Sequence, residues 1–72
     1  MDNLINVASY VFEVDSSSLS LDTERKNLEK WDSLAHLSLV AEIEERFQVR
    51  IPFEDIAGIK KLRDFLRYIK VY

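Results

Sequence analysis

SLAHLSLVAEIEERF, residues 33–47, predicts the central element of the fold, because its apolar residues recur at the spacing of an α-helix. One side of the expected helix is a core face made of His36, Leu39, Val40, Ile43 and Phe47. A second apolar arc consists of Leu34, Leu37 and Ala41, and two acids, Glu44 and Glu45, flank it. One core contact does not require so wide an apolar surface, so we expect a core face and an exposed docking face.

Shorter helices are expected on both sides of this one. Apolar residues at helical spacing predict a first helix over 3–13, with Asp2 as its N-cap. Pro52 and Gly58 bracket a short turn over 53–57. The last helix is expected over 61–70, on the spacing of Leu62, Phe65, Leu66 and Ile69.

Residues 14–32 differ from the rest, because their aspartates and serines favour local side-chain bonds over helix. A long loop is therefore expected, with four apolar residues that pin it to the core: Leu19, Leu21, Leu28 and Trp31. The predicted fold is all-α, in a single domain over residues 1–72. It is a small helical bundle of three main helices plus one short helix, with a long loop between helices 1 and 2.

The composition limits how such a small chain is stabilised. Its 72 residues include no cysteine and one histidine, so neither a disulfide nor a structural metal site is expected. The start, Met1-Asp2-Asn3-Leu4, lacks the basic residues of a signal peptide. Since no apolar run approaches the roughly 18 residues of a membrane span, we expect a cytoplasmic protein with no membrane insertion.

The net charge of −3 conceals two unlike parts. Residues 1–55 hold 12 acids and 5 bases, whereas residues 56–72 hold Asp64 against five bases. The acidic majority repels nucleic acid and favours basic protein surfaces as partners. The basic residues of the last helix are interpreted as a solvated face, so no nucleic acid is expected to bind.

Asp32-Ser33-Leu34 lies where the long loop meets the central helix. The stretch WDSLAHLSLVAEIEERFQVRIPFEDIAGIKKLRDFLRYI, residues 31–69, resembles acyl carrier proteins. The Asp-Ser-Leu motif is in register with further residues of that family's pattern, namely Glu44, Glu45, Phe47, Ile51, Pro52, Asp55, Tyr68 and Ile69. The first helix and the long loop agree in pattern but carry no specific motif.

The resemblance implies that Ser33 is the attachment residue of 4′-phosphopantetheine, which a phosphopantetheinyl transferase transfers from coenzyme A. Asp32 is then a binding residue that helps contact the transferase. The thiol of the arm holds an acyl group as a thioester, so the chain is a carrier and not an enzyme, with no catalytic residue of its own. The physics of the position agrees, because the first turn of a helix stabilises a phosphodiester and Asp32 is a good N-cap.

The resemblance also implies partners and a place for cargo. Acyl-loading and acyl-using enzymes of the family present basic docking surfaces, which the arc of Leu34, Leu37, Ala41, Glu44 and Glu45 would meet. An acyl pocket between the central and short helices would be lined by Val40, Ile43, Phe47, Ile56 and Ile59. Ordinary core packing explains these five residues equally well. A monomer is expected, as for a mobile shuttle.

Some residues depart from the family's pattern. Ala35 and Ser38 stand where fatty-acid carriers usually have acids, and Trp31 replaces a small residue. Lys60 and Lys61 stand where hydroxyl residues normally cap the last helix. These departures suggest a specialised carrier in a polyketide, lipid or surface-polysaccharide pathway, with partners of its own.

Three other interpretations remain open on the sequence. Ser33, His36 and Asp32 have the residue types of a small hydrolase, although a core-facing histidine beside a neighbouring aspartate is poorly placed for that chemistry. An unmodified helical interaction module would keep the fold without the arm. A carrier of aminoacyl or peptidyl groups would share every motif, because partner enzymes select the cargo.

Overall fold

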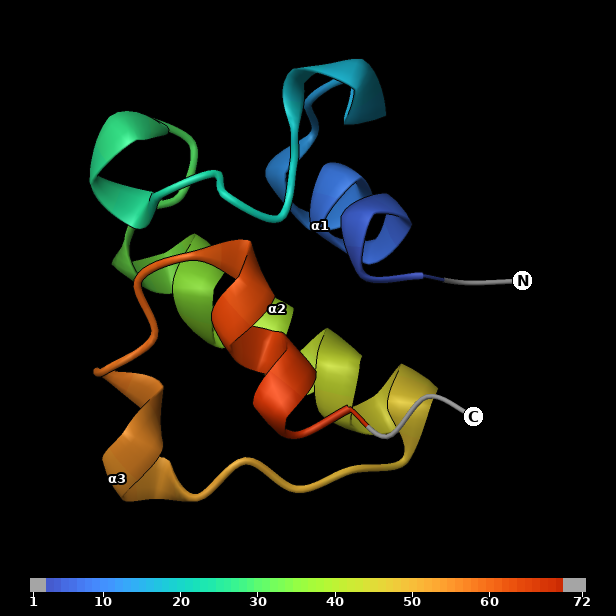
Figure 1. Cartoon of the computed structure of the whole chain (residues 1–72), viewed down its shortest axis with the longest axis vertical. Helices are drawn as coiled ribbons and strands as arrows, with labels where there is room; N and C mark the ends of the chain where they lie inside the picture. Colours follow the sequence, from blue (N-terminus) through green and yellow to red (C-terminus); the bar gives the residue numbers. More distant parts are fainter. Residues whose placement is uncertain (1–2, 70–72) are drawn as a thin grey trace.

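The computed structural model describes residues 3–69, which fold into helices joined by irregular segments (Figure 1). In chain order these are the α-helix α1 (Leu4–Phe12), the 3₁₀ segments η1 (Ser16–Ser18) and η2 (Arg25–Asn27), the α-helices α2 (Ser33–Phe47) and α3 (Phe53–Ile56), and the 3₁₀ helix η3 (Leu62–Arg67). Residues 3–69 contain no β-strand; an isolated antiparallel bridge joins Glu24 to Lys61. The all-α class is confirmed, and α2 has the predicted bounds.

The two long helices have well-defined ends. Asn3 caps α1, since its side chain accepts a hydrogen bond from the Asn6 N–H at 2.9 Å. The cap expected from the sequence was Asp2, which lies outside the described residues. The α2 helix is capped by Asp32, and both helices end at a residue in the left-handed region, Glu13 and Gln48.

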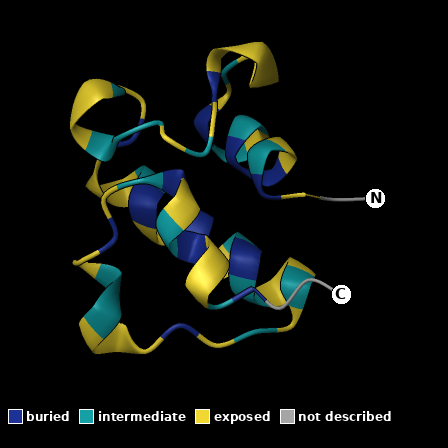
Figure 2. Ribbon diagram, in the orientation of Figure 1, coloured by how far each residue is buried: buried dark blue, intermediate teal, exposed yellow. Residues whose placement is uncertain are grey.

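The core lies between α1, α2 and η3 and is almost entirely apolar (Figure 2). Its buried apolar residues are Leu4, Val7, Ala8, Phe12, Leu19, Trp31, Leu39, Val40, Ile43, Ile51, Ile59, Leu62, Phe65 and Ile69. In Figure 1 the orange-red η3 crosses over the green α2, and the rings of Phe65 and His36 meet there with centroids 6.4 Å apart. Burial of this apolar surface is the main source of stability in a chain without disulfides.

The loop between α1 and α2 is pinned to the core as the sequence predicted. Leu19 and Trp31 are buried, and Leu21 and Leu28 pack partly buried against the core. Three backbone bonds tie the loop to η3 and the segment before it: Arg25 N–H to Lys60 O at 2.8 Å, Leu62 N–H to Thr23 O at 3.2 Å, and Arg63 N–H to Leu21 O at 2.8 Å. The loop is therefore an ordered part of the fold.

The last helix differs from the prediction in type and length. It is a six-residue 3₁₀ helix, and Lys70 lies outside the described residues. In a 3₁₀ helix residues i and i+3 stay in line, so Leu62 and Phe65 are buried while Leu66 is exposed. The backbone N–H groups of Lys60 and Lys61 donate to the Asp64 carboxylate at 2.9 and 3.1 Å. The Asp64 carboxylate thus satisfies the backbone donors of the two residues before η3.

One of the basic residues in this part has a structural partner. The Nε and Nη2 groups of Arg63 both donate to Asp22 Oδ1, at 2.9 and 2.7 Å. This exposed pair joins η3 to the loop and agrees with a solvated basic face. None of the helices within residues 3–69 is long and apolar enough to cross a bilayer.

Candidate functional site

Ser33 is the first residue of α2 and is exposed. Asp32, just before it, adopts an extended backbone, and its Oδ1 accepts a hydrogen bond from the Ala35 N–H at 2.8 Å. The first intrahelical bond runs from the His36 N–H to the Asp32 carbonyl at 2.8 Å. The N–H groups of Ser33 and Leu34 precede that bond and lie at the positive end of the helix.

The residues at this position fit a phosphodiester-linked arm. The exposed Ser33 hydroxyl gives a modifying enzyme access from solvent. The positive end of a 15-residue helix and its first N–H groups would stabilise a negative phosphate there. Asp32 is occupied as the N-cap, so its structural role is to begin the helix at Ser33.

An exposed apolar stripe runs from Ser33 along α2. Leu34 is 75% exposed and Leu37 is 55% exposed, and Ala41 and Glu45 continue the same side of the helix. Glu44 is placed differently from the other predicted docking residues. It is half-buried, and its Oε2 accepts a hydrogen bond from the Ile51 N–H at 2.8 Å. Glu44 therefore ties α2 to the segment before α3, while Glu45 is the acid exposed on the stripe.

Phe53 is an exposed aromatic residue that sequence analysis missed. It is 85% exposed at the start of α3, and acidic Glu54 and Asp55 follow it in the same short helix. An apolar side chain that stays in contact with water adds little to the stability of the fold, so Phe53 is available for contact with a partner. The sequence did carry a signal for this exposure. Phe53 directly follows Pro52 and begins a turn that is too short to bury both Phe53 and Ile56.

His36 is the one polar side chain buried in the core of the described part, at 3% exposed. The Trp31 Nε1–H donates to its Nδ1 at 2.8 Å, and its Nε2 lies 2.8 Å from the Ile56 carbonyl oxygen. Burial, the largest effect, and the charge of Arg25 lower the pKa of His36, while the Ile56 bond raises it, with a net lowering. Both ring nitrogens are occupied, so His36 is no base for Ser33, and the hydrolase interpretation fails on this geometry.

The five predicted pocket residues belong to or border the core. Val40, Ile43 and Ile59 are buried members of it. Phe47 and Ile56 are half-buried and pack against it. Ile56 is also the residue whose carbonyl His36 contacts, so the short helix α3 is linked to α2 at this side.

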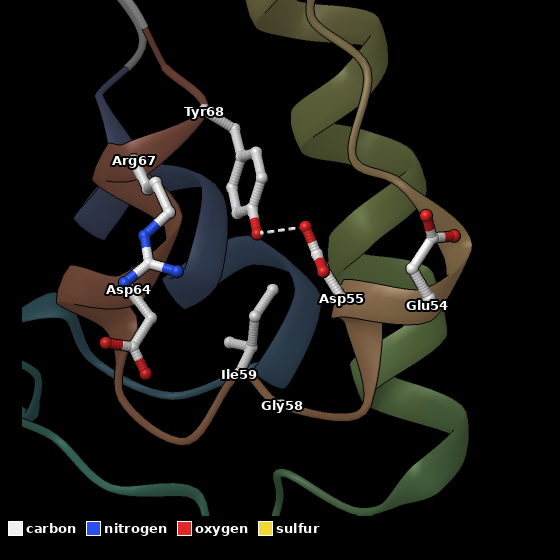
Figure 3. Close-up of a pocket in the computed structure, with 7 residues that line it drawn as sticks. All are labelled: Glu54, Asp55, Gly58, Ile59, Asp64, Arg67 and Tyr68. Carbon is white, nitrogen blue, oxygen red and sulfur yellow. Dashed lines mark hydrogen bonds between the residues drawn. The ribbon is translucent and has the colours of Figure 1, made fainter.

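A polar cleft of about 230 Å³ lies between α3 and η3 (Figure 3). Its lining is Glu54, Asp55, Gly58, Ile59, Asp64, Arg67 and Tyr68. The Tyr68 hydroxyl donates to Asp55 Oδ2 at 2.9 Å across it, and this bond raises the pKa of Tyr68. With Ile59 as the one predicted pocket residue on its wall, this charged cleft is distinct from the apolar pocket expected for an acyl chain.

Residues 2–69 match a family model described as a phosphopantetheine attachment site. An acyl carrier protein of Onion yellows phytoplasma (strain OY-M) is 38% identical over 56 residues, covering 78% of this chain and 74% of the relative. One from Kocuria rhizophila is 31% identical over 64 residues, covering 79% of each chain. One from Kineococcus radiotolerans is 42% identical over 38 residues, covering 53% of this chain and 47% of that protein.

Proposed function

The chain belongs to the acyl carrier protein family and bears covalent phosphopantetheine; from this premise we propose that residues 1–72 form one carrier domain with the arm on Ser33. The observation that supports the site most strongly is the exposed Ser33 at the first position of α2, directly after its Asp32 cap. The arm, when attached, supplies a thiol that holds an acyl group as a thioester. In the attachment step Ser33 Oγ loses its proton and bonds to the pantetheine-bearing phosphorus of coenzyme A, and adenosine 3′,5′-bisphosphate leaves.

The exposed stripe of α2 is the proposed docking face for partner enzymes. Leu34, Leu37 and Ala41 offer apolar contact beside Ser33, and Glu45 offers a charge to basic partner surfaces. A transferase and acyl-using enzymes would bind the same face in turn, because each of them must reach the arm at its one point of attachment, Ser33. Weak electrostatic encounters of this kind form and dissociate quickly, as a monomeric shuttle in the cytoplasm requires.

Cargo shelter is proposed for the apolar side of the α2–α3 region. Val40, Ile43 and Ile59 form its buried wall, with Phe47 and Ile56 at its half-buried edge. An acyl chain would enter by displacing side chains at the edge, since the buried members already pack against the rest of the core.

The pathway is proposed to be a specialised one. The docking stripe carries few acids, because Ala35 and Ser38 follow Ser33 and Glu44 is engaged with the Ile51 N–H. Exposed Leu34, Leu37 and Phe53 make apolar contact a larger share of recognition. Partners with a more apolar docking surface, in polyketide, lipid or surface-polysaccharide synthesis, would suit this face better than those of the main fatty-acid pathway.

The test of the attachment site is an intact-mass measurement. The chain is incubated with coenzyme A, magnesium and a broad-specificity phosphopantetheinyl transferase. The wild-type chain and Ser38→Ala, which removes another exposed hydroxyl from α2, are expected to gain one phosphopantetheine, and Ser33→Ala none. Modification of a folded Ser33→Ala chain would contradict the assignment.

A further inference from the structure

A chain of two hydrogen bonds passes through His36, three residues after Ser33. An indole N–H only donates, so the His36 Nδ1 that it contacts must be the unprotonated nitrogen. The Ile56 carbonyl oxygen only accepts, so His36 Nε2 must carry the hydrogen and donate the bond to that oxygen. The geometry therefore requires a neutral His36 with its proton on Nε2.

The first of these bonds holds the loop immediately before Ser33. Trp31, two residues before the serine, is 2% exposed. Its ring packs on Phe12 of α1 with centroids 5.3 Å apart. Asp32, the residue that links Trp31 to Ser33, is also the N-cap of α2. The entry into the attachment site therefore depends on where the Trp31 side chain is held.

A proton added to His36 would disturb one bond and keep the other. It would bind at Nδ1, which would then present an N–H group to the Trp31 N–H. Two donors cannot bond to each other, so the Trp31 indole would lose its partner while still buried, which is unfavourable. The contact with Ile56 would remain and gain strength from the charge. Protonation of His36 would thus weaken the contact that holds Trp31 and the end of the loop, and it would leave the contact with α3 in place.

The surroundings of His36 favour the neutral form. The Arg25 side chain of the loop is the nearby charge that acts on the ring, and like burial it lowers the pKa. Aromatic neighbours come from η3, as Phe65, and from α1, as Phe12 behind Trp31. From α3 the ring meets the Ile56 carbonyl, and the adjacent Asp55 carboxylate accepts a bond from Tyr68.

We propose that His36 is a proton-sensitive positioning residue for Ser33, which holds Trp31 and the entry into α2 when neutral and releases them when protonated. This inference rests on the proposed function, because it concerns how Ser33 is presented to the transferase. The proposal also gives a common role to Trp31, which departs from the family's pattern, and to the core-facing His36, which it contacts.

The direction of the pH effect follows from the lowered pKa of His36. As the pH falls, the unfolded chain takes up the proton first, near its ordinary value of about 6.5. The contribution of His36 to stability is therefore complete above that pH. It declines as the pH falls from about 6.5 toward the pKa of the folded chain.

The first measurement follows the indole N–H of Trp31, the single tryptophan of the chain, by nuclear magnetic resonance of the ¹⁵N-labelled protein. In the wild type the indole resonance is expected to shift in one transition below about pH 6.5. In His36→Gln, which keeps a donor and an acceptor without a titrating group, it should not shift. A wild-type indole that is unchanged by acid, or an equal shift in both chains, would overturn the proposal.

The second measurement is the rate of phosphopantetheine transfer, taken as the ratio of wild type to His36→Gln at each pH. The ratio cancels the transferase's own pH dependence. It is expected to fall about threefold to tenfold between about pH 7.5 and a pH below the transition, as for the loss of one buried hydrogen bond. A constant ratio would overturn the positioning role.

A second variant keeps the test valid if His36→Gln folds poorly. Trp31→Phe removes the indole N–H at every pH, so its transfer rate relative to wild type should rise as the pH falls. A ratio that stays level would again contradict the proposal. Failure of the proposed function gives a different result, in which no chain gains mass at any pH although the indole resonance still shifts. The positioning role of His36 would then be wrong as well, because Ser33 would not be an attachment residue.

Discussion

The two faces of α2 are both apolar, yet only one of them is packed. His36, Leu39 and Ile43 lie in the core, whereas Leu34 and Leu37 on the other face are largely exposed. The faces begin within one turn of each other, directly after Ser33. Since burial of apolar surface supplies stability, the core face should determine whether the chain folds. The exposed face contributes little to folding and is free to serve partners.

The largest expected difference between the faces is in the free energy of unfolding. Ile43→Ala removes a side chain that is fully buried and should cost about 2–5 kcal/mol. Leu37→Ala is the matched change on the exposed face and should alter stability by less than about 0.5 kcal/mol. Urea unfolding followed by circular dichroism measures both. Equal losses in the two variants would show that the exposed stripe is part of the core.

Glu44 lies between the two faces and is tied to the segment before α3. Glu44→Ala removes the acceptor of the Ile51 N–H and should cost about 1–2 kcal/mol in urea unfolding. Glu44→Gln keeps an acceptor and should recover most of that loss. Glu45→Ala, one residue further and exposed, should leave stability nearly unchanged. If Glu44→Ala and Glu45→Ala behave alike, the bond to Ile51 has no structural value.

The docking role of the exposed face predicts an effect on rate without an effect on folding. Leu37→Ala should slow phosphopantetheine transfer about threefold to tenfold, because it removes a contact of roughly 1 kcal/mol with the transferase. Steady-state rates at low carrier concentration measure this effect. Tyr10→Ala is a suitable control, since Tyr10 is an exposed aromatic residue on α1. A transfer rate slowed as much by the control as by Leu37→Ala would remove the reason to single out this stripe.

The smallest expected effect is that of the exposed acid. Glu45→Gln should weaken encounters with a basic partner by about 0.2–1 kcal/mol. The difference should disappear as salt is raised, because exposed charges are screened. Transfer rates at low and high ionic strength give the comparison. A difference that persists at high salt would mean that Glu45 makes a direct bond and does not act by steering.

Sequence periodicity predicted α2 well because its core face repeats over four turns and Asp32 fixes its start. It was less successful after residue 52, where the elements are short. Four apolar residues spaced over positions 62–69 could not distinguish an α-helix from the 3₁₀ helix η3, in which Leu66 is exposed. The Asp32-Ser33-Leu34 motif predicts the attachment site at Ser33, which stays a proposal. The bonds of Glu44 to Ile51 and of His36 to Trp31 depend on the tertiary fold, which local patterns do not report.

The proposed attachment at Ser33 is tested by locating the phosphopantetheine on the modified wild-type chain with fragment-ion mass spectrometry. Trypsin should release residues 31–46, a peptide that contains both Ser33 and Ser38. Fragmentation between the two serines then distinguishes modification of Ser33, at the start of α2, from modification of Ser38, further along the helix. We expect the entire added mass to lie on Ser33. Added mass on Ser38, or on any other peptide, would contradict it.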